Sequence, residues 1–515
     1  MKRRVLSLIL VPFLLFYAIP QSAGAVEKEE RKWQDETIYF LMVDRFNNGD
    51  SNNDFEVNTK DPKAYQGGDF QGIIDKLDYI KDMGFTSISL TPIFDNQELG
   101  YHGYWINDFY KPEEHFGSMK TFKKLVKEAH KRDIKVILDF VVNHVGTEHP
   151  WVNDPEKADW FHEKQEMNFE NEESMNNAWL DGLPDLNTEN PEVRAYLTDA
   201  AKWWIKETNI DGYQLDAVQH VPQDFWKEFS KEIKSVKEDF YLLGEVSEGN
   251  PTKIAEYNGV GIDGFVKVPQ AEEMRSVFQK TDQSLDKLFT FWQENENLYK
   301  DPYVMGTFID NHNMERFTRP VVQNKLHPGT RWKLALTYMY TTPGVPIVYY
   351  GTEIAVDGGE APDNRRMMNF RAEEELMDYI TNLGELRHTY PALTRGTIEP
   401  LYESDGMGIF KREYKGETLV VAINNSSVSQ EIQLDAADLA KDMELRGLLG
   451  DDMVKEEDGK YTLILDREQA EVYALAEKSG LNYSFIGALA IVYVLFLTFI
   501  YLVWKRGRNR RKSDN

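Results

Sequence analysis

Acidic residues and histidines follow four short apolar runs of the sequence, each of which is predicted to be a buried β-strand. The runs and the polar residues after them are Gly212–Leu215 with Asp216, Phe240–Leu243 with Glu245, Val304–Ile309 with Asp310 and His312, and Val136–Phe140 with Asn143 and His144. A single aspartate in such a place is most simply a helix N-cap, because burial of an unpaired carboxylate is costly. Four such groups at strand ends instead predict an active site on one rim of a parallel barrel.

Oxygen-bearing side chains are also dense on the loop that follows the first predicted strand, Thr37–Val43. This loop, residues 44–54, is rich in Asp and Asn and contains a glycine. Such ligands suit a hard cation such as calcium, although a solvated polar loop has the same composition. Gly67-Gly68-Asp69 lies just ahead of a helix expected over Gly72–Met83 and is placed to close the same site.

The elements that position these groups alternate between strands and helices. Strand Ser87–Leu90 is followed by a loop carrying Tyr101–Trp105. The helices expected between the strands include Lys120–Arg132, Pro191–Thr208, Gln223–Glu238 and Glu373–His388. Eight strand–helix pairs can be counted up to strand Val345–Tyr350, and this spacing favours βα units around a parallel sheet.

Two segments interrupt this alternation. Val145–Asn187 has no clear periodicity, and because long segments of this kind are usually functional, we predict a small domain inserted after the third strand. Residues 396–476 show strand-like alternation without a long helix, which predicts a C-terminal antiparallel β-sandwich. The expected limits are 26–144 and 188–393 for the main domain, 145–187 for the insertion and 394–477 for the sandwich.

The charge of the chain limits the kinds of molecule that it is expected to bind. The chain has 515 residues, no cysteine and a net charge of −27. The first 25 residues carry +3 and the last 11 carry +5, which leaves −35 on the segment between them. So acidic a body repels nucleic acid and anionic lipid, and it suits neutral ligands or divalent cations. We expect a monomer without nucleic-acid partners.

The two ends of the chain predict its location. Residues 1–25 combine Lys2-Arg3-Arg4, an apolar run and Ala23-Gly24-Ala25, as a secretory signal peptide does. Phe485–Trp504 is an uncharged run long enough to span a bilayer, with a buried core helix as the alternative. The basic tail, 505–515, would remain cytoplasmic, and residues 478–484 would be the linker. We therefore expect a secreted protein anchored in the membrane, with its body outside the cell.

Several ordered segments resemble the motifs of the α-amylase family of glycoside hydrolases. The four main ones are Asp139–His144, Gly212–His220, Gly244–Val246 and Phe308–His312, and the accessory ones are Gly84–Pro92, Leu183–Leu186 and Gly344–Glu353. The pair Trp203-Trp204 also resembles a subset of bacterial α-amylases, although it is equally suited to packing against the sheet. The resemblance covers the whole segment between the two terminal regions.

The resemblance implies a (β/α)8 TIM barrel that cleaves α-glucosidic bonds with retention of configuration. Retention requires one carboxylate to attack the sugar carbon and a second to protonate the leaving oxygen. Motif position makes Asp216 the nucleophile, Glu245 the acid/base and Asp310 the third carboxylate, which holds the sugar hydroxyls. The residues expected to contact the sugar are His102, Tyr104, His144, Gln214, His312 and Asp363.

The resemblance also implies calcium. Asn143 and Asp185 would bind one ion through their side chains and His220 through its carbonyl oxygen, joining the insertion to the barrel. The residues that resemble a second calcium site are Asn48, Asp50, Asn53, Gly67 and Asp69, with the register around Asn53 and Asp54 open by one residue.

Three positions depart from the family pattern. Gln214 stands where the family has Arg, Gln219 where it has Lys or Arg, and Asn313 where it has Asp. Two classes of function therefore follow. One is an endo-acting hydrolase of α-1,4 bonds in starch, glycogen or maltodextrins, with a transglycosylase or cyclodextrin-degrading enzyme as a variant. The other is a weakened or inactive glycan-binding surface protein.

Overall fold

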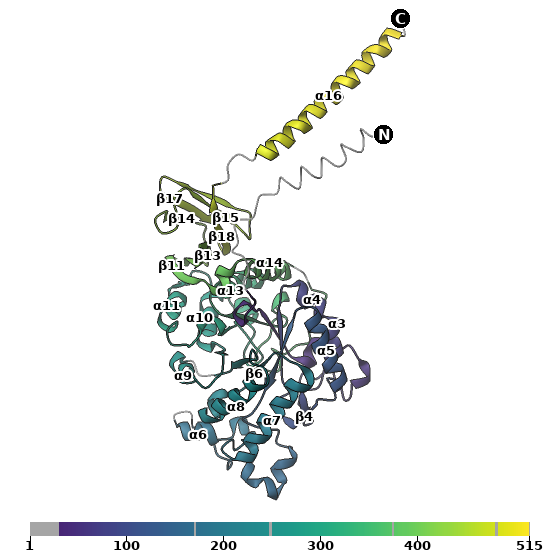
Figure 1. The fold of residues 1–515 in the computed structure, drawn as a ribbon, viewed down its shortest axis with the longest axis vertical. Coiled ribbons are helices and arrows are strands. Elements are labelled where there is room, and N and C mark those ends of the chain that lie inside the picture. Colours follow the sequence, from purple (N-terminus) through teal and green to yellow (C-terminus); the bar gives the residue numbers. More distant parts are fainter. Residues whose placement is uncertain (1–29, 169–170, 247–249, 373–374, 479–482, 514–515) are drawn as a thin grey trace.

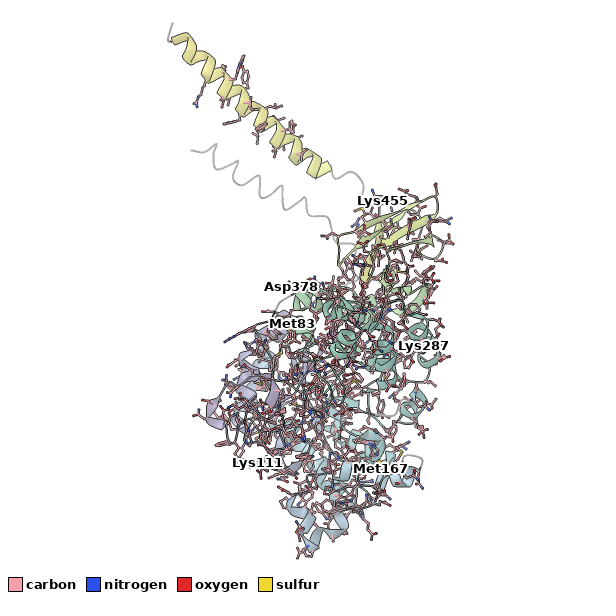
Figure 2. All side chains as sticks on the ribbon, turned by 180° about the vertical axis from the view of Figure 1, so that it is seen from behind. Met83, Lys111, Met167, Lys287, Asp378 and Lys455 are labelled. Atoms are coloured by element: carbon pink, nitrogen blue, oxygen red, sulfur yellow. The ribbon has the colours of Figure 1, made fainter. Side chains whose placement is uncertain are left out.

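The computed structural model describes residues 30–168, 171–246, 250–372, 375–478 and 483–513. Figure 1 shows the barrel, the C-terminal sheet beside it and the C-terminal helix as successive parts of the chain. The predicted signal peptide lies outside the described residues. Side chains are drawn along both the barrel and the C-terminal sheet in Figure 2, and each part has buried apolar residues.

Eight parallel strands of the described chain form the barrel. They are β1 (Ile38–Leu41), β2 (Ser87–Leu90), β5 (Lys135–Phe140), β6 (Gly212–Leu215), β7 (Tyr241–Gly244), β8 (Gly264–Phe265), β9 (Gly306–Thr307) and β10 (Val345–Tyr349). They are ordered β8-β7-β6-β5-β2-β1-β10-β9, and a parallel bridge between Val266 and Gly306 joins the two ends. The predicted parallel barrel is confirmed.

The strand predicted over Val304–Ile309 is much shorter in the structure. Only Gly306–Thr307 form β9, because the preceding Pro302–Val304 form a 3-10 turn capped by the Asp301 carboxylate. Proline at the start of that turn has no N–H to donate to a strand ladder.

Helices cover the outside of the barrel (Figure 1). The main ones are α5 (Met119–Lys131), α7 (Pro191–Thr208), α8 (Gln223–Val236), α10 (Val268–Phe278), α11 (Asp286–Asn295), α13 (Pro328–Thr341) and α14 (Glu375–Thr389). Short ones are α2 (Val43–Phe46), α9 (Pro251–Ala255), α12 (Thr318–Gln323) and α15 (Pro391–Arg395). Asn190 caps α7 ahead of Pro191, and Asn209 ends it in the left-handed conformation.

The single helix predicted over Gly72–Met83 is wrong. The structure has α3 (Phe70–Asp75) and α4 (Leu77–Asp82), separated at Lys76, whose backbone leaves the helical region. The Lys76 ammonium lies 4.1 Å from the centre of the Phe370 ring. Ile73 of α3 and Ile80 of α4 are both fully buried.

Two excursions from the barrel carry residues toward its carboxyl rim. Between β2 and α5, the antiparallel pair β3 (Phe94–Asn96) and β4 (Ile106–Pro112) encloses the loop with His102 and Tyr104. The indole N–H of Trp204, on α7, donates a 2.7 Å hydrogen bond to the Phe109 carbonyl of β4. Between β5 and α7, short turns and α6 (Glu172–Asn177) occupy the segment predicted as an insertion.

The C-terminal part is antiparallel, as predicted. Its strands are β11 (Thr397–Ser404), β12 (Met407–Tyr414), β13 (Glu417–Asn424), β14 (Gln430–Asp435), β15 (Met443–Gly447), β16 (Met453–Glu457), β17 (Lys460–Leu465) and β18 (Gln469–Glu477). They are joined in one continuous sheet, ordered β11-β12-β13-β18-β15-β16-β17-β14, which encloses an apolar core of its own. The opposite face, including Phe410 and Val421, belongs to the core of the barrel.

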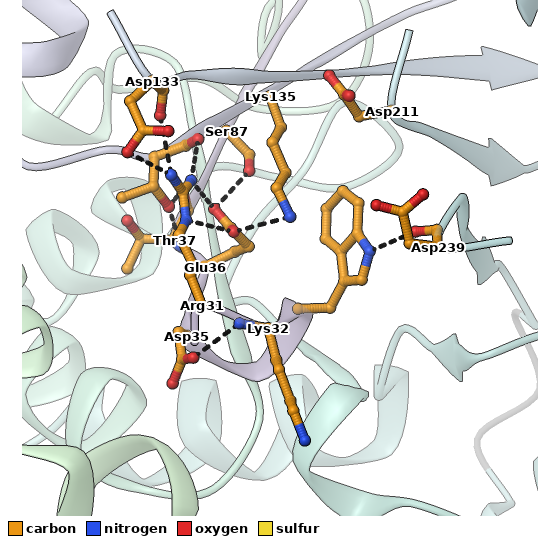
Figure 3. Close-up of polar contacts among 12 residues, drawn as sticks. Arg31, Lys32, Asp35, Glu36, Thr37, Ser87, Asp133, Lys135, Asp211 and Asp239 are labelled. Carbon is orange, nitrogen blue, oxygen red and sulfur yellow. Dashed lines mark hydrogen bonds and ion pairs between the residues drawn. The ribbon is translucent and has the colours of Figure 1, made fainter. Parts of the chain in front are cut away.

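The N-terminal segment contacts the first residues of β2, β5 and β7, and its polar contacts are drawn in Figure 3. Glu36 is fully buried, and its carboxylate pairs with Arg31 at 2.5 Å and with Lys135 at 3.2 Å. The Trp33 ring stacks on Tyr241 with centroids 4.4 Å apart. These contacts lie at the amino ends of the barrel strands. An active site of this fold is expected at the opposite rim, where the carboxyl ends of the strands meet.

The last described helix, α16 (Tyr483–Ser513), contains the predicted span 485–504. Its segment Leu489–Arg506 is long and apolar enough to cross a membrane and is not buried against the rest of the described chain.

Candidate active site

A cavity of about 810 Å³ opens at the carboxyl ends of the barrel strands. Six of the residues predicted to act on or contact a sugar line it: His102, Tyr104, His144, Asp216, Glu245 and His312. Other lining residues include Gln97, Trp105, Leu183, Gln219, Asn313 and Arg365. The strands and loops thus bring together groups that lie up to 210 positions apart in the sequence, from His102 to His312.

Asp216 and Glu245 stand at the same level of two adjacent strands. Leu215 of β6 pairs with Gly244 of β7, and each carboxylate is on the next residue. Neighbouring strands lie about 4.8 Å apart, which suits the roughly 5 Å between the two carboxyl groups of a retaining glycosidase. The pairing register of β6 and β7 therefore places the two carboxyl groups side by side.

The Asp216 carboxyl holds its proton to unusually high pH. Burial and the neighbouring charge of Glu245 raise its pKa to about 8. Part of the side chain remains exposed to the cavity. No Lys or Arg of the described chain stabilises the ionised form of this carboxyl.

Glu245 is 8% exposed, and burial raises the pKa of its carboxyl, against hydrogen bonds from Gln214 and Asn313. The Gln214 amide nitrogen donates to Glu245 Oε2 at 3.4 Å, and its oxygen accepts from Ser89 Oγ at 3.3 Å. The side chain of Gln214 therefore donates to Glu245, the acid that follows the neighbouring strand β7. Asp216 is two residues after Gln214 along the chain. A carboxyl whose pKa is raised above its usual range suits a proton donor.

Asp310 is almost fully buried and is not among the residues that line the cavity. Its Oδ2 accepts the Phe317 backbone N–H at 2.7 Å. Burial raises its pKa, while the guanidinium groups of Arg316 and Arg275 act in the opposite direction. Asp310 is thus the acid of this site that has cations near it.

The histidines of the site are neutral at ordinary pH. Burial lowers the pKa of His102 to about 3 and that of His144 to about 4, and it lowers that of His312 strongly. Neutral imidazoles can exchange hydrogen bonds with hydroxyl groups without bringing charge. The Tyr104 ring lies parallel to His312, with centroids 5.2 Å apart, and forms an aromatic wall of the cavity.

Asp363 is placed differently from the other predicted sugar contacts. Its carboxylate accepts from Arg319 at 2.9 Å and from Arg366 at 2.6 Å, and it is not among the lining residues. The cavity is lined instead by Arg365, two positions on, whose guanidinium donates to the His312 carbonyl. Asn364 and Arg365 both donate to the His312 carbonyl, which holds this segment against the residues that follow β9.

Asp139 is a functional candidate for which the sequence predicted no role. It is fully buried on β5, in register with Gln214, and its Oδ2 accepts a 2.6 Å hydrogen bond from Tyr104 Oη. Its pKa is raised well above the usual range by burial and by the charges of Asp216 and Glu245. The available signal was its place at the start of the motif Asp139–His144.

The three residues of the first predicted calcium site lie together. Asn143 Nδ2 donates to Asp185 Oδ1 at 2.7 Å and to the His220 carbonyl at 3.2 Å. The other Asp185 oxygen contacts His162 Nδ1 at 2.6 Å. A carboxylate, an amide and a carbonyl converging in a buried place fit the oxygen donors that calcium takes, with the Asn143 amide turned to present its oxygen.

The second predicted calcium site divides into two groups. Asn48 Nδ2 donates to Asp54 Oδ1 at 2.8 Å, and a Cβ on Gly67 would lie 2.6 Å from the same nitrogen. Asp69 instead accepts backbone N–H groups from Gly49, Asp50 and Gly72, which makes it the N-cap of α3. Asn53 Oδ1 is buried without a hydrogen-bond partner among the described residues, so Asn48, Asn53 and Asp54 fit an ion better than Asp69 does.

Comparison with known proteins identifies the family. Residues 40–388 match the family model of the alpha amylase catalytic domain, and residues 396–473 match that of the alpha-amylase C-terminal domain. The chain belongs to the α-amylase family. It is therefore an α-amylase-family glycoside hydrolase, as the motifs predicted.

Two solved α-amylases are similar over most of the chain. The crystal structure of an Anoxybacillus α-amylase is 62% identical with a TM-score of 0.87, and the match covers 88% of this chain and all of the other. The α-amylase of Geobacillus thermoleovorans, complexed with acarbose, is 56% identical with a TM-score of 0.85, over 87% of this chain and all of the other.

Relatives with other names are also similar. A β/α-amylase of Paenibacillus polymyxa is 37% identical over 86% of this chain, but the chain spans only 38% of that protein. Further relatives are named cyclomaltodextrinase, cyclomaltodextrin glucanotransferase and maltogenic α-amylase. Because these names include both hydrolases and transferases, family membership alone does not fix the specific activity.

Proposed function

We propose that this α-amylase-family enzyme is a retaining, endo-acting hydrolase of α-1,4-glucosidic bonds in starch, glycogen or maltodextrins. The observation that carries the proposal is the placement of Asp216 and Glu245 side by side on β6 and β7, facing one cavity. The cavity, of about 810 Å³, is partly open to solvent and is lined by residues from Gln97 to Arg365 along the chain. An open cleft admits the middle of a chain.

Each residue then has a distinct task. Glu245 donates its proton to the leaving glycosidic oxygen while the ionised Asp216 attacks the anomeric carbon, and a covalent glycosyl–enzyme forms. Glu245, now ionised, takes a proton from water, which releases the sugar with its original configuration. Asp310, whose Oδ1 has no hydrogen-bond partner among the described residues, is assigned by its motif to the sugar hydroxyls as positive charge develops on the ring. The neutral histidines fix the remaining hydroxyls.

Calcium is proposed as the structural ion of the cleft. Asn143, Asp185 and the His220 carbonyl would hold it where β5, the segment before α7 and the turn after β6 meet. A bound cation would fix the turn that follows Asp216 and thereby the wall of the cavity. Asn48, Asn53, Asp54 and Gly67 are proposed for a second ion.

A second candidate activity is the opening of cyclodextrin rings or the transfer of glucosyl chains. It is favoured by the names of relatives that are 34% and 29% identical, a cyclomaltodextrinase and a cyclomaltodextrin glucanotransferase. The choice between them depends on whether water or a sugar hydroxyl reaches the glycosyl–enzyme.

Product analysis separates these activities. The purified full chain is incubated with starch, maltoheptaose or β-cyclodextrin, and the products are resolved by chromatography over time. Internal cleavage of starch into mixed maltooligosaccharides supports the proposal. Faster opening of the cyclodextrin supports the second candidate, and products longer than maltoheptaose indicate transfer. The absence of all products would contradict both activities.

We further propose that the enzyme is secreted and held at the cell membrane by α16, with the cleft outside. The uncharged run up to Trp504 is followed directly by a basic tail, which favours a cytoplasmic C-terminus. Protease added to intact cells would then digest the catalytic domain and leave a membrane-embedded fragment. Release of the whole chain by a salt wash would contradict the anchor.

A further inference from the structure

The four acids at the centre of the site differ in the cations that surround them. The charges of Arg316 and Arg275 act on Asp310 against the burial that raises its pKa. No Lys or Arg of the described chain acts in this way on Asp139, Asp216 or Glu245. Three carboxyl groups therefore lie near one another without an ion pair to Lys or Arg among the described residues.

One oxygen of Asp139 has no hydrogen-bond partner among the described residues, and the same holds for Asp310 Oδ1, His144 Nε2 and His312 Nδ1 elsewhere in the site. Asp139 is fully buried; its Oδ2 accepts from Tyr104, but Oδ1 has no hydrogen-bond partner among the described residues. A buried carboxylate oxygen without a partner is costly. Asp139 and Gln214 pair in register on β5 and β6, so the two side chains project from neighbouring positions of the barrel wall.

Gln214 can present either end of its amide to this region. Its nitrogen faces Glu245 and its oxygen faces Ser89 Oγ. A serine hydroxyl both donates and accepts, so rotation of the amide by half a turn preserves the bond to Ser89 and directs the oxygen toward Glu245. Asp139 Oδ1, Gln214 Oε1 and Glu245 Oε2 then offer three oxygens to one cation.

We propose that a small monovalent cation, of the class of sodium, potassium or ammonium, binds between Asp139 and Glu245 at the amide of Gln214. The cation supplies the positive charge that an arginine at position 214 would supply. It favours ionisation of Asp216 and holds Glu245 in place. The effect on catalysis rests on the proposed hydrolase function, whereas binding of the cation does not.

The test compares salts at one ionic strength, one pH and one calcium concentration. Hydrolysis of maltoheptaose and thermal unfolding of the full chain are measured in choline chloride, whose cation is too large for the site, and in sodium, potassium and ammonium chloride. We expect kcat/KM near pH 7 to rise saturably with the small cation, on the order of tenfold for each unit by which the pKa of Asp216 falls. The melting temperature should rise in parallel.

Two variants identify the site. Gln214→Arg carries its own charge, so its melting temperature and its activity should be the same in choline and in small-cation salts. Asp139→Asn should abolish the cation-dependent rise in melting temperature. Glu353→Gln is the matched control, because Glu353 is another fully buried acid whose partners, Tyr39 and Tyr79, lie elsewhere, and it should retain the rise.

The two readouts keep the proposals separate. A chain with a cation-dependent melting temperature but no hydrolysis in any salt keeps the cation site and loses the hydrolase function. Equal melting temperature and equal kcat/KM of the parent in choline and in all three small-cation salts would overturn the cation site. Identical cation responses of Asp139→Asn and Glu353→Gln would overturn it as well.

Discussion

Tyr104 Oη donates a 2.6 Å hydrogen bond to Asp139 Oδ2, and the same tyrosine ring lies parallel to His312. One aromatic side chain thus joins the loop after β2, the end of β5 and the residues after β9. This arrangement couples a wall of the cavity to an acid beneath it. Changes on the loop are therefore expected to reach the catalytic carboxyls through Asp139.

The first prediction concerns the two acids assigned to bond cleavage. Glu245→Gln should lower kcat by about 100- to 10,000-fold, the usual contribution of a general acid, and Asp216→Asn by at least as much. Each keeps the shape of the side chain, so the circular dichroism spectrum should not change. Asp378→Asn, an exposed change on α14 (Figure 2), is the control and should retain full activity. Retention of most of the activity by either acid variant would reassign its role.

The second prediction concerns calcium. An ion that binds only the folded chain stabilises it by about 2.7 kcal/mol at a free concentration of 100 times its Kd. Excess chelator should therefore lower the melting temperature, and added calcium should restore it. Asp185→Asn should reduce the change in melting temperature on adding chelator or calcium, whereas Asp378→Asn should not affect it. A melting temperature that chelator leaves unchanged would remove both proposed calcium sites.

The third prediction follows from the raised pKa of Asp216, about 8. An attacking carboxyl must be ionised, so activity falls as the pH drops through this pKa. Gln214→Arg adds a cation that favours the ionised form and should move the acid limb of kcat/KM to lower pH. The measurement is the pH–rate profile of the folded variant beside Gln433→Arg, which adds the same charge on exposed β14. Coincident acid limbs in parent and Gln214→Arg would show that another group already supplies the charge.

The fourth prediction separates the two adjacent tryptophans. Trp204 is fully buried and holds the Phe109 carbonyl, whereas Trp203 is half-buried. Trp204→Phe leaves that carbonyl without its donor, which costs about 1–3 kcal/mol, and loosens the strand pair whose loop carries Tyr104. Denaturant unfolding should show the loss, and KM for maltoheptaose should rise. Trp203→Phe should change both much less; equal effects would deny Trp204 this role.

The acids at the rim, Asp216, Glu245 and Asp310, could be predicted from the sequence. Each directly follows a short apolar run, and this pattern involves only residues that are neighbours in the chain. Helix α7 was predicted to the residue, since Asn190-Pro191 marks its start and Asn209 its end. The register of β6 against β7 then placed Asp216 beside Glu245. These features depend on neighbours in sequence or on adjacent strands, which periodicity reports well.

Other features depend on contacts that periodicity does not report. At the break between α3 and α4, the Lys76 ammonium lies over the ring of Phe370, nearly 300 residues away in the chain. The contact of Gln214 with Glu245, rather than with the acid on its own strand, depends on how β6 faces β7 and β2. The position of Arg365 in the cavity wall depends on a loop whose course is fixed by bonds to the His312 carbonyl.

The boundary between the barrel and the C-terminal sheet has a consequence for recombination. Arg412 of β12 is fully buried and donates to the carbonyls of Thr341, on α13, and Gly396. Phe410 and Val421 lie in the same apolar cluster as the barrel residues. We therefore expect that the C-terminal sheet cannot be replaced by that of another protein without loss of stability. A chimera of this barrel with a foreign sheet would lose the hydrogen bond from the buried Arg412 guanidinium to the barrel. We expect the barrel and the C-terminal sheet to be inherited together, and sequence changes to be more readily accepted in the loops at the rim.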